Sequence, residues 1–293
     1  MVRKLLIAVF LLNTVFLNAQ DDDFDLLGDE EKQVYPVDYA FKTTKVVNLQ
    51  SLEITDFGVL DFKMMHRFGS INNGPVEAFG LDQATVRFGL EYGIVDNLMI
   101  SMGRSNVLGN KNLDAFLKYR ILQQNTDNSI PVTLIALGGA QYLLGSAHDS
   151  KTQLDRSSFF GQLIIGRKFT EDLSVEIAPT WLTNARNPIT TGPWTYYEQQ
   201  WALGIGMRQK ITPRSSINLE YIPVLTNKGN VYNSFSVGMD VETGGHVFQF
   251  QLTNSIGLNE TQFISNTTEQ WNNVGIRLGF NLSRVFTIVK PRL

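Results

Sequence analysis

Charged side chains recur at alternate positions along many segments of this sequence, and opposite charges stand close together. Asp61 and Lys63 are separated by one residue, and Arg87 and Glu91 by three. Brought to one surface, such side chains either pair with one another or line a polar passage or binding site. The pattern includes seven charges of each sign: Asp61, Lys63, Arg67, Arg87, Glu91, Asp114, Lys118, Arg120, Glu176, Glu198, Arg208, Glu220, Asp240 and Arg277.

The residues between these charges are apolar, and this alternation predicts the elements that carry them. In the stretch 83–105, Val86, Phe88 and Leu90 fall on one face of an extended strand, whereas Arg87 and Glu91 fall on the other. Successive side chains of a strand point to opposite faces, so the period of two indicates β-structure. Asp and Asn at 96–97 then supply a tight turn into a second strand.

The same unit recurs along the chain. Strands are predicted at 58–68, 84–94, 98–105, 113–121, 132–144, 159–169, 173–181, 197–211, 217–223, 235–241, 247–253 and 274–286. Long loops are predicted at 69–82, 106–112, 145–157, 183–196, 225–233 and 254–271, and they alternate with short turns. The connection at 123–130 is longer than the other turns. This alternation of long loops and short turns favours an all-β membrane fold over a soluble sandwich. The predicted fold is a single antiparallel up-and-down transmembrane β-barrel of about twelve strands.

In such a barrel the apolar face meets lipid. An outward cation would cost about 2–4 kcal/mol near the bilayer midplane, so we expect all fourteen charges to face the lumen. A lumen between twelve strands is intermediate between filled and open barrels. The sequence therefore leaves two interpretations open, a paired network that fills the lumen and a polar conduit.

The N-terminal part divides into three regions. Residues 1–19 carry Arg3, Lys4 and an apolar run too short to span a bilayer, which predicts a signal peptide. Residues 20–57 are predicted to be a periplasmic segment, partly disordered over the acidic run 21–32. Whether residues 34–57 enter the barrel mouth is left open. The barrel itself is expected over 58–293, in the outer membrane, with the long loops outside.

Composition excludes several classes of protein. The chain has no Cys, so disulfides, thiolate chemistry and Cys-based metal sites are ruled out. A formal net charge of −3 predicts no nucleic-acid partner. The mean hydropathy of −0.07 would fit an exported soluble protein, and it is also what alternating strands average to. No cofactor and no metal site are predicted.

Catalytic candidates are few. Of three histidines, His66 falls on the apolar face of its strand, and His148 lies in a loop with Ser146, Asp149 and Ser150. The members of a catalytic triad normally come from separate rigid elements, so a single loop argues against that chemistry. We predict no enzymatic activity. The alternative is an outer-membrane enzyme acting on lipid, for which His66 is the candidate.

The strings LDFKMMHRFG, FGLDQATVRFGLEYGIVDNLMISMGRS, LKYRIL and GFNLSRVFTI together resemble an uncharacterised family of outer-membrane β-barrels from Bacteroidota, a domain of unknown function, over roughly residues 40–290. The resemblance implies a barrel in the outer membrane and transfers no catalytic or ligand-binding residue.

These observations predict a non-enzymatic barrel, either a narrow channel for small polar solutes or a structural barrel with a charge-filled lumen. A barrel whose loops bind other surface proteins is a further alternative. The expected partners are outer-membrane lipid and small polar solutes, and the oligomeric state is left open.

Overall fold

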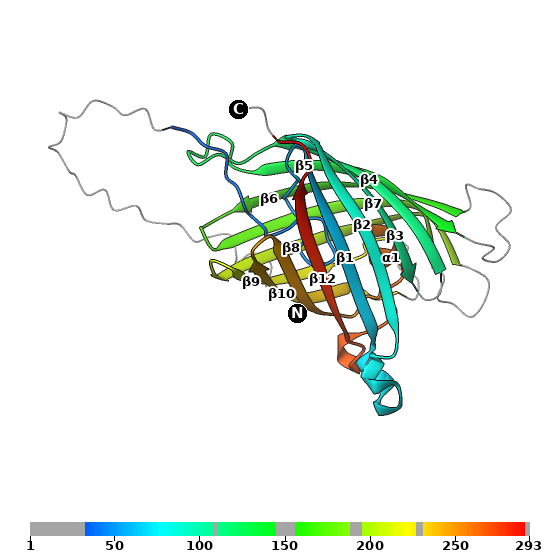
Figure 1. Cartoon of the computed structure of the whole chain (residues 1–293). Helices are drawn as coiled ribbons and strands as arrows, with labels where there is room; N and C mark the ends of the chain where they lie inside the picture. Colours follow the sequence, from blue (N-terminus) through cyan, green and yellow to red (C-terminus); the bar gives the residue numbers. More distant parts are fainter. Residues whose placement is uncertain (1–32, 108–109, 145–155, 188–194, 227–230, 291–293) are drawn as a thin grey trace, which may run out of the picture. The chain divides into compact units, whose positions relative to one another are not determined.

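The alternating segments form strands throughout the computed structural model. Residues 33–107, 110–144, 156–187, 195–226 and 231–290 are described, with backbone alone for 184–187 and 195–198. The strands are β1 Val59–Ser70, β2 Ala84–Val95, β3 Leu98–Val107, β4 Asn110–Leu122, β5 Thr133–Leu144, β6 Ser157–Lys168, β7 Leu173–Asn187, β8 Thr195–Thr212, β9 Ser215–Ile222, β10 Ser234–Thr243, β11 His246–Thr253 and β12 Arg277–Thr287 (Figure 1).

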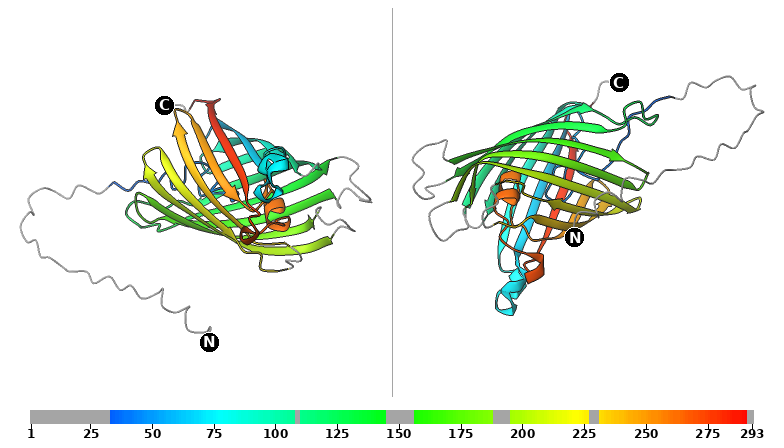
Figure 2. Two further views of the ribbon diagram at one scale, coloured as in Figure 1. Left: turned by 90° about the horizontal axis from the view of Figure 1, so that it is seen from below. Right: turned by 180° about the vertical axis from the view of Figure 1, so that it is seen from behind.

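Each strand pairs antiparallel with its sequence neighbours, and the first and last strands close the ring (Figure 2). β1 pairs with β12 from Val59 opposite Thr287 to Ser70 opposite Arg277. The sheet is therefore a closed up-and-down barrel, which leaves no unpaired edge. The predicted fold class and strand number are confirmed.

The connections differ between the two ends of the barrel. Short turns at 96–97, 169–172, 213–214 and 244–245 lie at one end, called here the turn end, and the opposite end is called the loop end. The prediction of a long loop at 106–112 is wrong. Pairing between β3 and β4 continues to Val107 opposite Asn110, so only two residues separate these strands.

The connection between β4 and β5, at the turn end, is long because it forms backbone hydrogen bonds with the segment that precedes β1. The backbone N–H of Thr126 donates to the carbonyl of Tyr35 at 2.9 Å, and the N–H of Val37 donates to Gln124 at 2.7 Å. The segment between β4 and β5 thus pairs with the chain that leads into β1. The exceptional length of 123–132 serves this contact.

The helices are short. α1 spans Glu260–Ser265, and short 3-10 segments occur at η1 Ile71–Asn73, η2 Pro75–Gly80, which is kinked, and η4 Trp271–Asn273. Asn259 caps α1, because its side chain accepts a hydrogen bond from the backbone N–H of Gln262.

Among the described residues, no helix is long and apolar enough to cross a bilayer.

The outer surface of the strands is apolar. Phe88 and Leu90 are each 50% exposed, whereas Arg87 and Glu91, which flank them in sequence, are each at most 1% exposed. Large aromatic side chains lie exposed near both ends of the strands: Tyr119, Phe169 and Phe286 at the turn end, and Trp201 and Tyr221 at the loop end. Rings at these two levels suit the headgroup zones of a bilayer.

Candidate functional site: the occupied lumen

Most of the fourteen charges singled out from the sequence are buried inside the barrel. Arg120 is only half-buried near the turn end, and the side chain of Glu198 lies outside the described residues. The buried charges are Asp61, Lys63, Arg67, Arg87, Glu91, Asp114, Lys118, Glu176, Arg208, Glu220, Asp240 and Arg277, none more than 7% exposed. Six carry each sign.

Several of these charges pair across strands. The guanidinium of Arg87 donates from Nε to Asp114 Oδ2 at 2.9 Å and from Nη2 to Oδ1 at 2.5 Å. Glu91, the nearest acid to Arg87 on the same face of β2, instead accepts from Thr44 Oγ1 at 2.5 Å. Lys63 lies 2.8 Å from Asp61 and 3.7 Å from Glu91. Because buried ions need such partners, this network stiffens one side of the lumen.

The lumen also holds part of the chain that precedes the barrel. Residues 40–55, called here the plug, are buried except for the half-buried Lys42 and Glu53. The plug is a hairpin, since Ser51 N–H donates to Thr44 at 2.9 Å and Val46 N–H to Leu49 at 2.9 Å. The sequence left open whether this segment enters the barrel, and the predicted boundary at residue 58 does not separate it from the strands.

A single carboxylate of the barrel wall, that of Glu220 on β9, accepts several hydrogen bonds from the tip of the plug. Glu220 Oε2 accepts from the backbone N–H groups of Asn48 at 2.8 Å, Leu49 at 2.7 Å and Val47 at 3.2 Å. Its other oxygen accepts from Asn48 Nδ2 at 2.9 Å. Hydrogen bonds to an ionised acceptor are among the strongest in proteins, so β9 anchors the hairpin turn.

Side chains of three other strands also form hydrogen bonds with the tip of the plug. Arg67 Nη2 on β1 donates to Asn48 Oδ1 at 2.9 Å. The carbonyl of Val47 accepts from Asn281 Nδ2 at 3.1 Å, and that of Val46 accepts from Gln249 Nε2 at 3.1 Å. Side chains of β1, β9, β11 and β12 therefore satisfy the polar groups of a turn that is removed from water.

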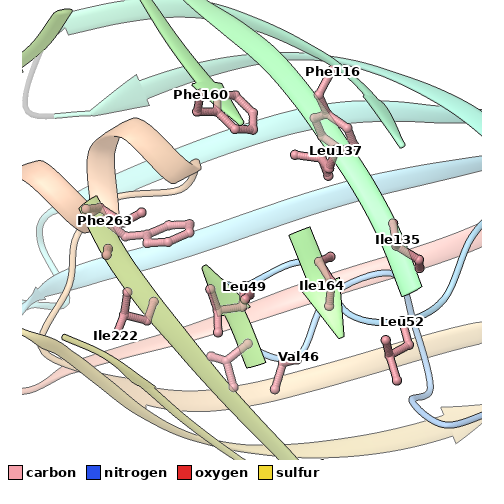
Figure 3. Close-up of a cluster of buried hydrophobic side chains, with 14 of the residues drawn as sticks. Val46, Leu49, Leu52, Phe116, Ile135, Leu137, Phe160, Ile164, Ile222 and Phe263 are labelled. Atoms are coloured by element: carbon pink, nitrogen blue, oxygen red, sulfur yellow. The ribbon is translucent and has the colours of Figure 1, made fainter. Parts of the chain in front are cut away.

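The plug contributes apolar side chains to a hydrophobic core inside the barrel (Figure 3). Val46, Leu49 and Leu52 are buried there. The wall supplies inward apolar residues from β4, β5, β6 and β9: Phe116, Ile135, Leu137, Phe160, Ile164 and Ile222. These inward residues would face water in an open channel, and the plug removes them from it.

Two glycines of β8 make room for the plug. A Cβ at Gly204 would lie 2.7 Å from Leu49 Cδ2, and one at Gly206 would lie 3.0 Å from Val46 Cγ2. The missing side chains let the hairpin approach the strand closely.

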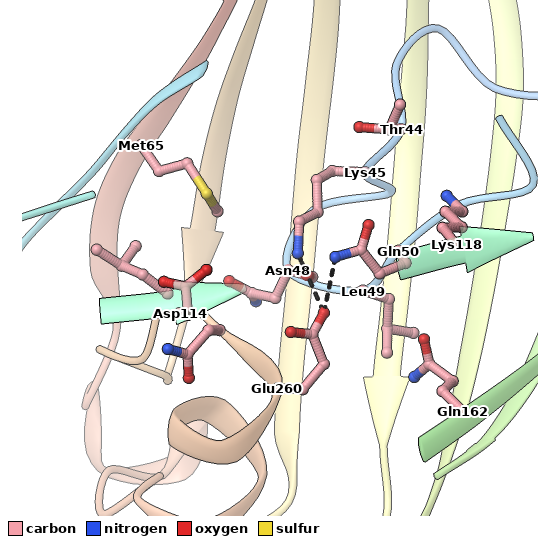
Figure 4. A network of polar contacts seen from close by, with 12 residues as sticks. Thr44, Lys45, Asn48, Leu49, Gln50, Met65, Asp114, Lys118, Gln162 and Glu260 are labelled. Atoms are coloured by element: carbon pink, nitrogen blue, oxygen red, sulfur yellow. Dashed lines mark hydrogen bonds and ion pairs between the residues drawn. The ribbon is translucent and has the colours of Figure 1, made fainter. Parts of the chain in front are cut away.

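A second segment fills the lumen from the loop end. Residues 254–267, which include α1 and are called here the inserted loop, are all buried. Glu260 Oε1 accepts from Lys45 Nζ at 3.2 Å and from Gln50 Nε2 at 2.9 Å (Figure 4). The plug and the inserted loop therefore meet through a buried ion pair.

A polar cavity remains between the plug and the wall at the turn end. Its volume is about 450 Å³, and Lys42, Glu53, Asp61 and Arg120 line it together with Glu242. At one side of this cavity Lys42 and Glu242 form an ion pair, with 2.5 Å between Lys42 Nζ and Glu242 Oε2.

The described residues assemble no catalytic centre around His66. Its ring faces outward and lies 5.1 Å from that of Phe280 and 4.3 Å from that of Phe68. The loop containing Ser146, His148, Asp149 and Ser150 lies outside the described residues. In the described part of the chain, no group of His, Asp or Glu side chains could hold a metal ion.

Sequence reasoning left open whether the plug enters the barrel and identified none of its contacts. The sequence nevertheless carries a signal. β8 presents glycines to the lumen, and β5 and β6 present apolar side chains to it, and neither kind of residue suits a lumen filled with water.

A closed barrel with an apolar outer belt and a polar, occupied lumen defines a membrane β-barrel. The chain belongs to the family described as membrane bound beta barrel domain (DUF5777), which matches residues 41–286. This match begins within the plug, so the family includes the plug with the strands.

Solved structures give weaker likenesses. The NanC porin has 10% identity and a TM-score of 0.49, with 78% of this chain and 100% of that chain covered. A COG4313 outer membrane channel from Pseudomonas putida F1 has 14% identity and a TM-score of 0.48, covering 80% and 97%. The KdgM porin has 12% identity and a TM-score of 0.46, covering 78% and 99%. At these values the likenesses carry no functional argument. Comparison with curated proteins gives no match.

Proposed function

We propose that this protein is a non-enzymatic outer-membrane channel whose own N-terminal plug closes it at rest. The turn end faces the periplasm, and residues 1–19 are removed as a signal peptide. The plug enters from the periplasmic side. Small polar solutes pass when the plug leaves the lumen and the inserted loop, released from the Lys45–Glu260 ion pair, leaves with it. The observation that carries the proposal is the burial of residues 40–55 within the closed ring of strands.

The charges of the wall support a class of solute. The buried wall residues include six acids and six bases, so the charges of the wall balance when the plug and the inserted loop, which carry Lys45 and Glu260, both leave the lumen. A wall with balanced charges discriminates weakly between anions and cations. The proposed solutes are therefore uncharged or zwitterionic polar molecules.

A disulfide that locks the plug tests this proposal. A Cβ added at Gly238 would lie 3.0 Å from Val47 Cγ2, a position that the Sγ of a Cys at 47 could take, and the Cβ atoms joined by a disulfide lie about 3.5–4.5 Å apart. The double variant Val47→Cys with Gly238→Cys should therefore cross-link the plug to β10. The chain has no Cys of its own, so the two single variants serve as clean controls.

The measurement is single-channel conductance of the full-length protein in planar bilayers. We expect rare openings in the reduced double variant and in both single variants, and none in the oxidised double variant until a reductant is added. Equal conductance with and without the disulfide would show that the plug is not the gate.

A second candidate is a structural barrel that never opens. The four hydrogen bonds to Glu220 and the buried core of Figure 3 favour it, because both hold the plug firmly. In that case the reduced protein shows no conductance at any voltage, and Glu220→Ala lowers stability without producing openings.

A further inference from the structure

An apolar groove on the outer surface of the barrel is lined by residues of β1 to β6. Figure 1 shows where these strands lie. Its volume is about 530 Å³. Two small residues, Ala115 and Ala140, lie opposite each other on β4 and β5 and form its floor. Larger side chains flank them: Phe62, Phe88, Leu90, Met102, Leu113 and Tyr142. The groove is thus wide enough to take a hydrocarbon chain.

Two cations stand at the loop end of this groove. Arg104 on β3 lines it, and Lys111 on β4 lies diagonally beside Arg104, because Arg104 pairs with Leu113 and Asn106 pairs with Lys111. Both side chains are exposed on the outer face. Neither makes a hydrogen bond or ion pair with any described residue, and β2 to β5 present no outward acid within their described residues.

Outward cations at the turn end are different, since they have partners within the protein. Arg284 lies 4.9 Å from the centre of the Phe286 ring. Arg167 donates to the carbonyl of Pro131 at 2.8 Å and to Asn128 Oδ1 at 2.7 Å. Arg104 and Lys111 are therefore two neighbouring outward cations of the strands whose charge the described residues leave uncompensated.

A cation on a lipid-facing surface is unfavourable unless an anion accompanies it. The planar guanidinium of Arg suits a phosphate group, which it binds through two parallel hydrogen bonds, and Lys adds a second positive charge. The groove below them is apolar and suits an acyl chain. A phosphorylated lipid provides both parts in the right order, headgroup toward the loop end and chain toward the middle of the strands.

We infer that this groove binds one molecule of lipopolysaccharide, with a lipid A phosphate between Arg104 and Lys111 and an acyl chain over Ala115 and Ala140. The choice of lipopolysaccharide over phospholipid rests on the proposed function, which places the loop end in the outer leaflet. The site lies on the opposite face of the sheet from the plug, so it does not depend on whether the channel opens.

Native mass spectrometry of the full-length protein in detergent tests the inference. The probes are lipopolysaccharide, its lipid A before and after removal of phosphate, phosphatidylglycerol and inorganic phosphate. We expect one lipopolysaccharide per barrel and at least tenfold weaker binding after removal of phosphate from lipid A. The double variant Arg104→Gln with Lys111→Gln should lose affinity by a similar factor.

Two further variants separate the headgroup from the chain. Ala140→Leu keeps both charges and fills the floor of the groove, so it should also weaken binding of lipopolysaccharide. Arg284→Gln removes an outward cation at the turn end and should leave binding unchanged.

Several outcomes overturn the inference. These are unchanged binding in the Arg104/Lys111 double variant, equal affinity for lipid A without phosphate, tighter binding of phosphatidylglycerol, and full competition by inorganic phosphate at millimolar concentration. None of them alters the conductance test with the locked plug, so failure here leaves the proposed channel standing.

Discussion

Arg87 on β2 and Asp114 on β4 form a two-bonded ion pair that passes over the intervening strand β3. Gly103 on β3 is the residue beneath this pair, since a Cβ there would lie 2.3 Å from Arg87 Nη2 and 2.5 Å from its Cζ. The pair is buried on both sides. It therefore links β2 to β4 across β3 through side chains, in addition to the backbone ladder that joins the three strands.

The first prediction concerns this pair. Arg87→Ala leaves the Asp114 carboxylate buried without its cation, which typically costs about 3–5 kcal/mol. We expect urea unfolding in detergent micelles to show a loss of that order. The double variant Arg87→Ala with Asp114→Ala should lose clearly less than the sum of the two single variants; full additivity would mean that the pair contributes nothing as a pair.

The second prediction concerns Gly103. Gly103→Ala should displace the guanidinium of Arg87 and lower the free energy of unfolding. Gly138→Ala is the matched control, because it makes the same change on the outer face of β5, where the nearest atom would lie 3.9 Å from the new Cβ. Equal effects of the two substitutions on the midpoint of urea unfolding would refute the steric role of Gly103.

The third prediction concerns the anchor of the plug. Glu220→Ala removes the acceptor of four hydrogen bonds to the plug tip. We expect more frequent channel openings and faster labelling of a cysteine placed at Asn48 by a water-soluble thiol reagent. Glu171→Ala, in an exposed turn at the turn end, is the control and should change neither rate. If labelling stays as slow in Glu220→Ala as in the control, other contacts hold the plug.

The fourth prediction concerns pH. Burial raises the pKa of the Glu53 carboxyl within the plug, although the Phe41 N–H donates to it at 3.0 Å and Arg120 and Lys118 lie near. The docked plug therefore binds this proton more tightly than the released plug does. Docking is strongest at low pH, weakens as pH rises above the ordinary Glu value, and levels off above the raised pKa.

Channel openings should accordingly become more frequent as pH rises through that window. Glu53→Gln removes the titrating group and should flatten this dependence while leaving conductance of the open state unchanged. A pH dependence that persists unaltered in Glu53→Gln would assign it to another group.

The fifth prediction concerns the lipid-facing surface. Leu90→Arg places a cation on the outer face of β2 and should cost about 2–4 kcal/mol if the site is near the bilayer midplane. Asn106→Arg, also outward but near the loop end of β3, should cost much less. The measurement is the fraction of protein that keeps its folded, faster migration in unheated electrophoresis. Equal tolerance of both variants would mean that this surface does not meet lipid.

The barrel could be predicted from sequence because its signal is local. Arg87, Phe88, Gly89 and Leu90 alternate with a period of two, and this period alone assigns each side chain to a face. Closure follows, since a sheet with one apolar face and no edge satisfies every backbone group in lipid. The same period predicts that Asp61, Arg87 and Glu220 point into the lumen, although it leaves open whether they are buried there.

The partners of those side chains depend on tertiary structure. Glu220 contacts the N–H groups of Val47, Asn48 and Leu49, more than 170 residues away in sequence. Nothing in the local pattern of either segment encodes that distance. An inward glycine such as Gly206 indicates curvature or free space in the lumen, and the structure shows that Val46 of the plug approaches it closely.

By itself, the sequence determined which face of each strand meets lipid and that the strands close into one barrel. Only the tertiary structure decided what fills the lumen, because the plug and the inserted loop are irregular segments without a repeating pattern. Lys45 of the plug and Glu260 of the inserted loop form an ion pair in the lumen. This contact exists only once the ring of strands has brought the two distant segments together.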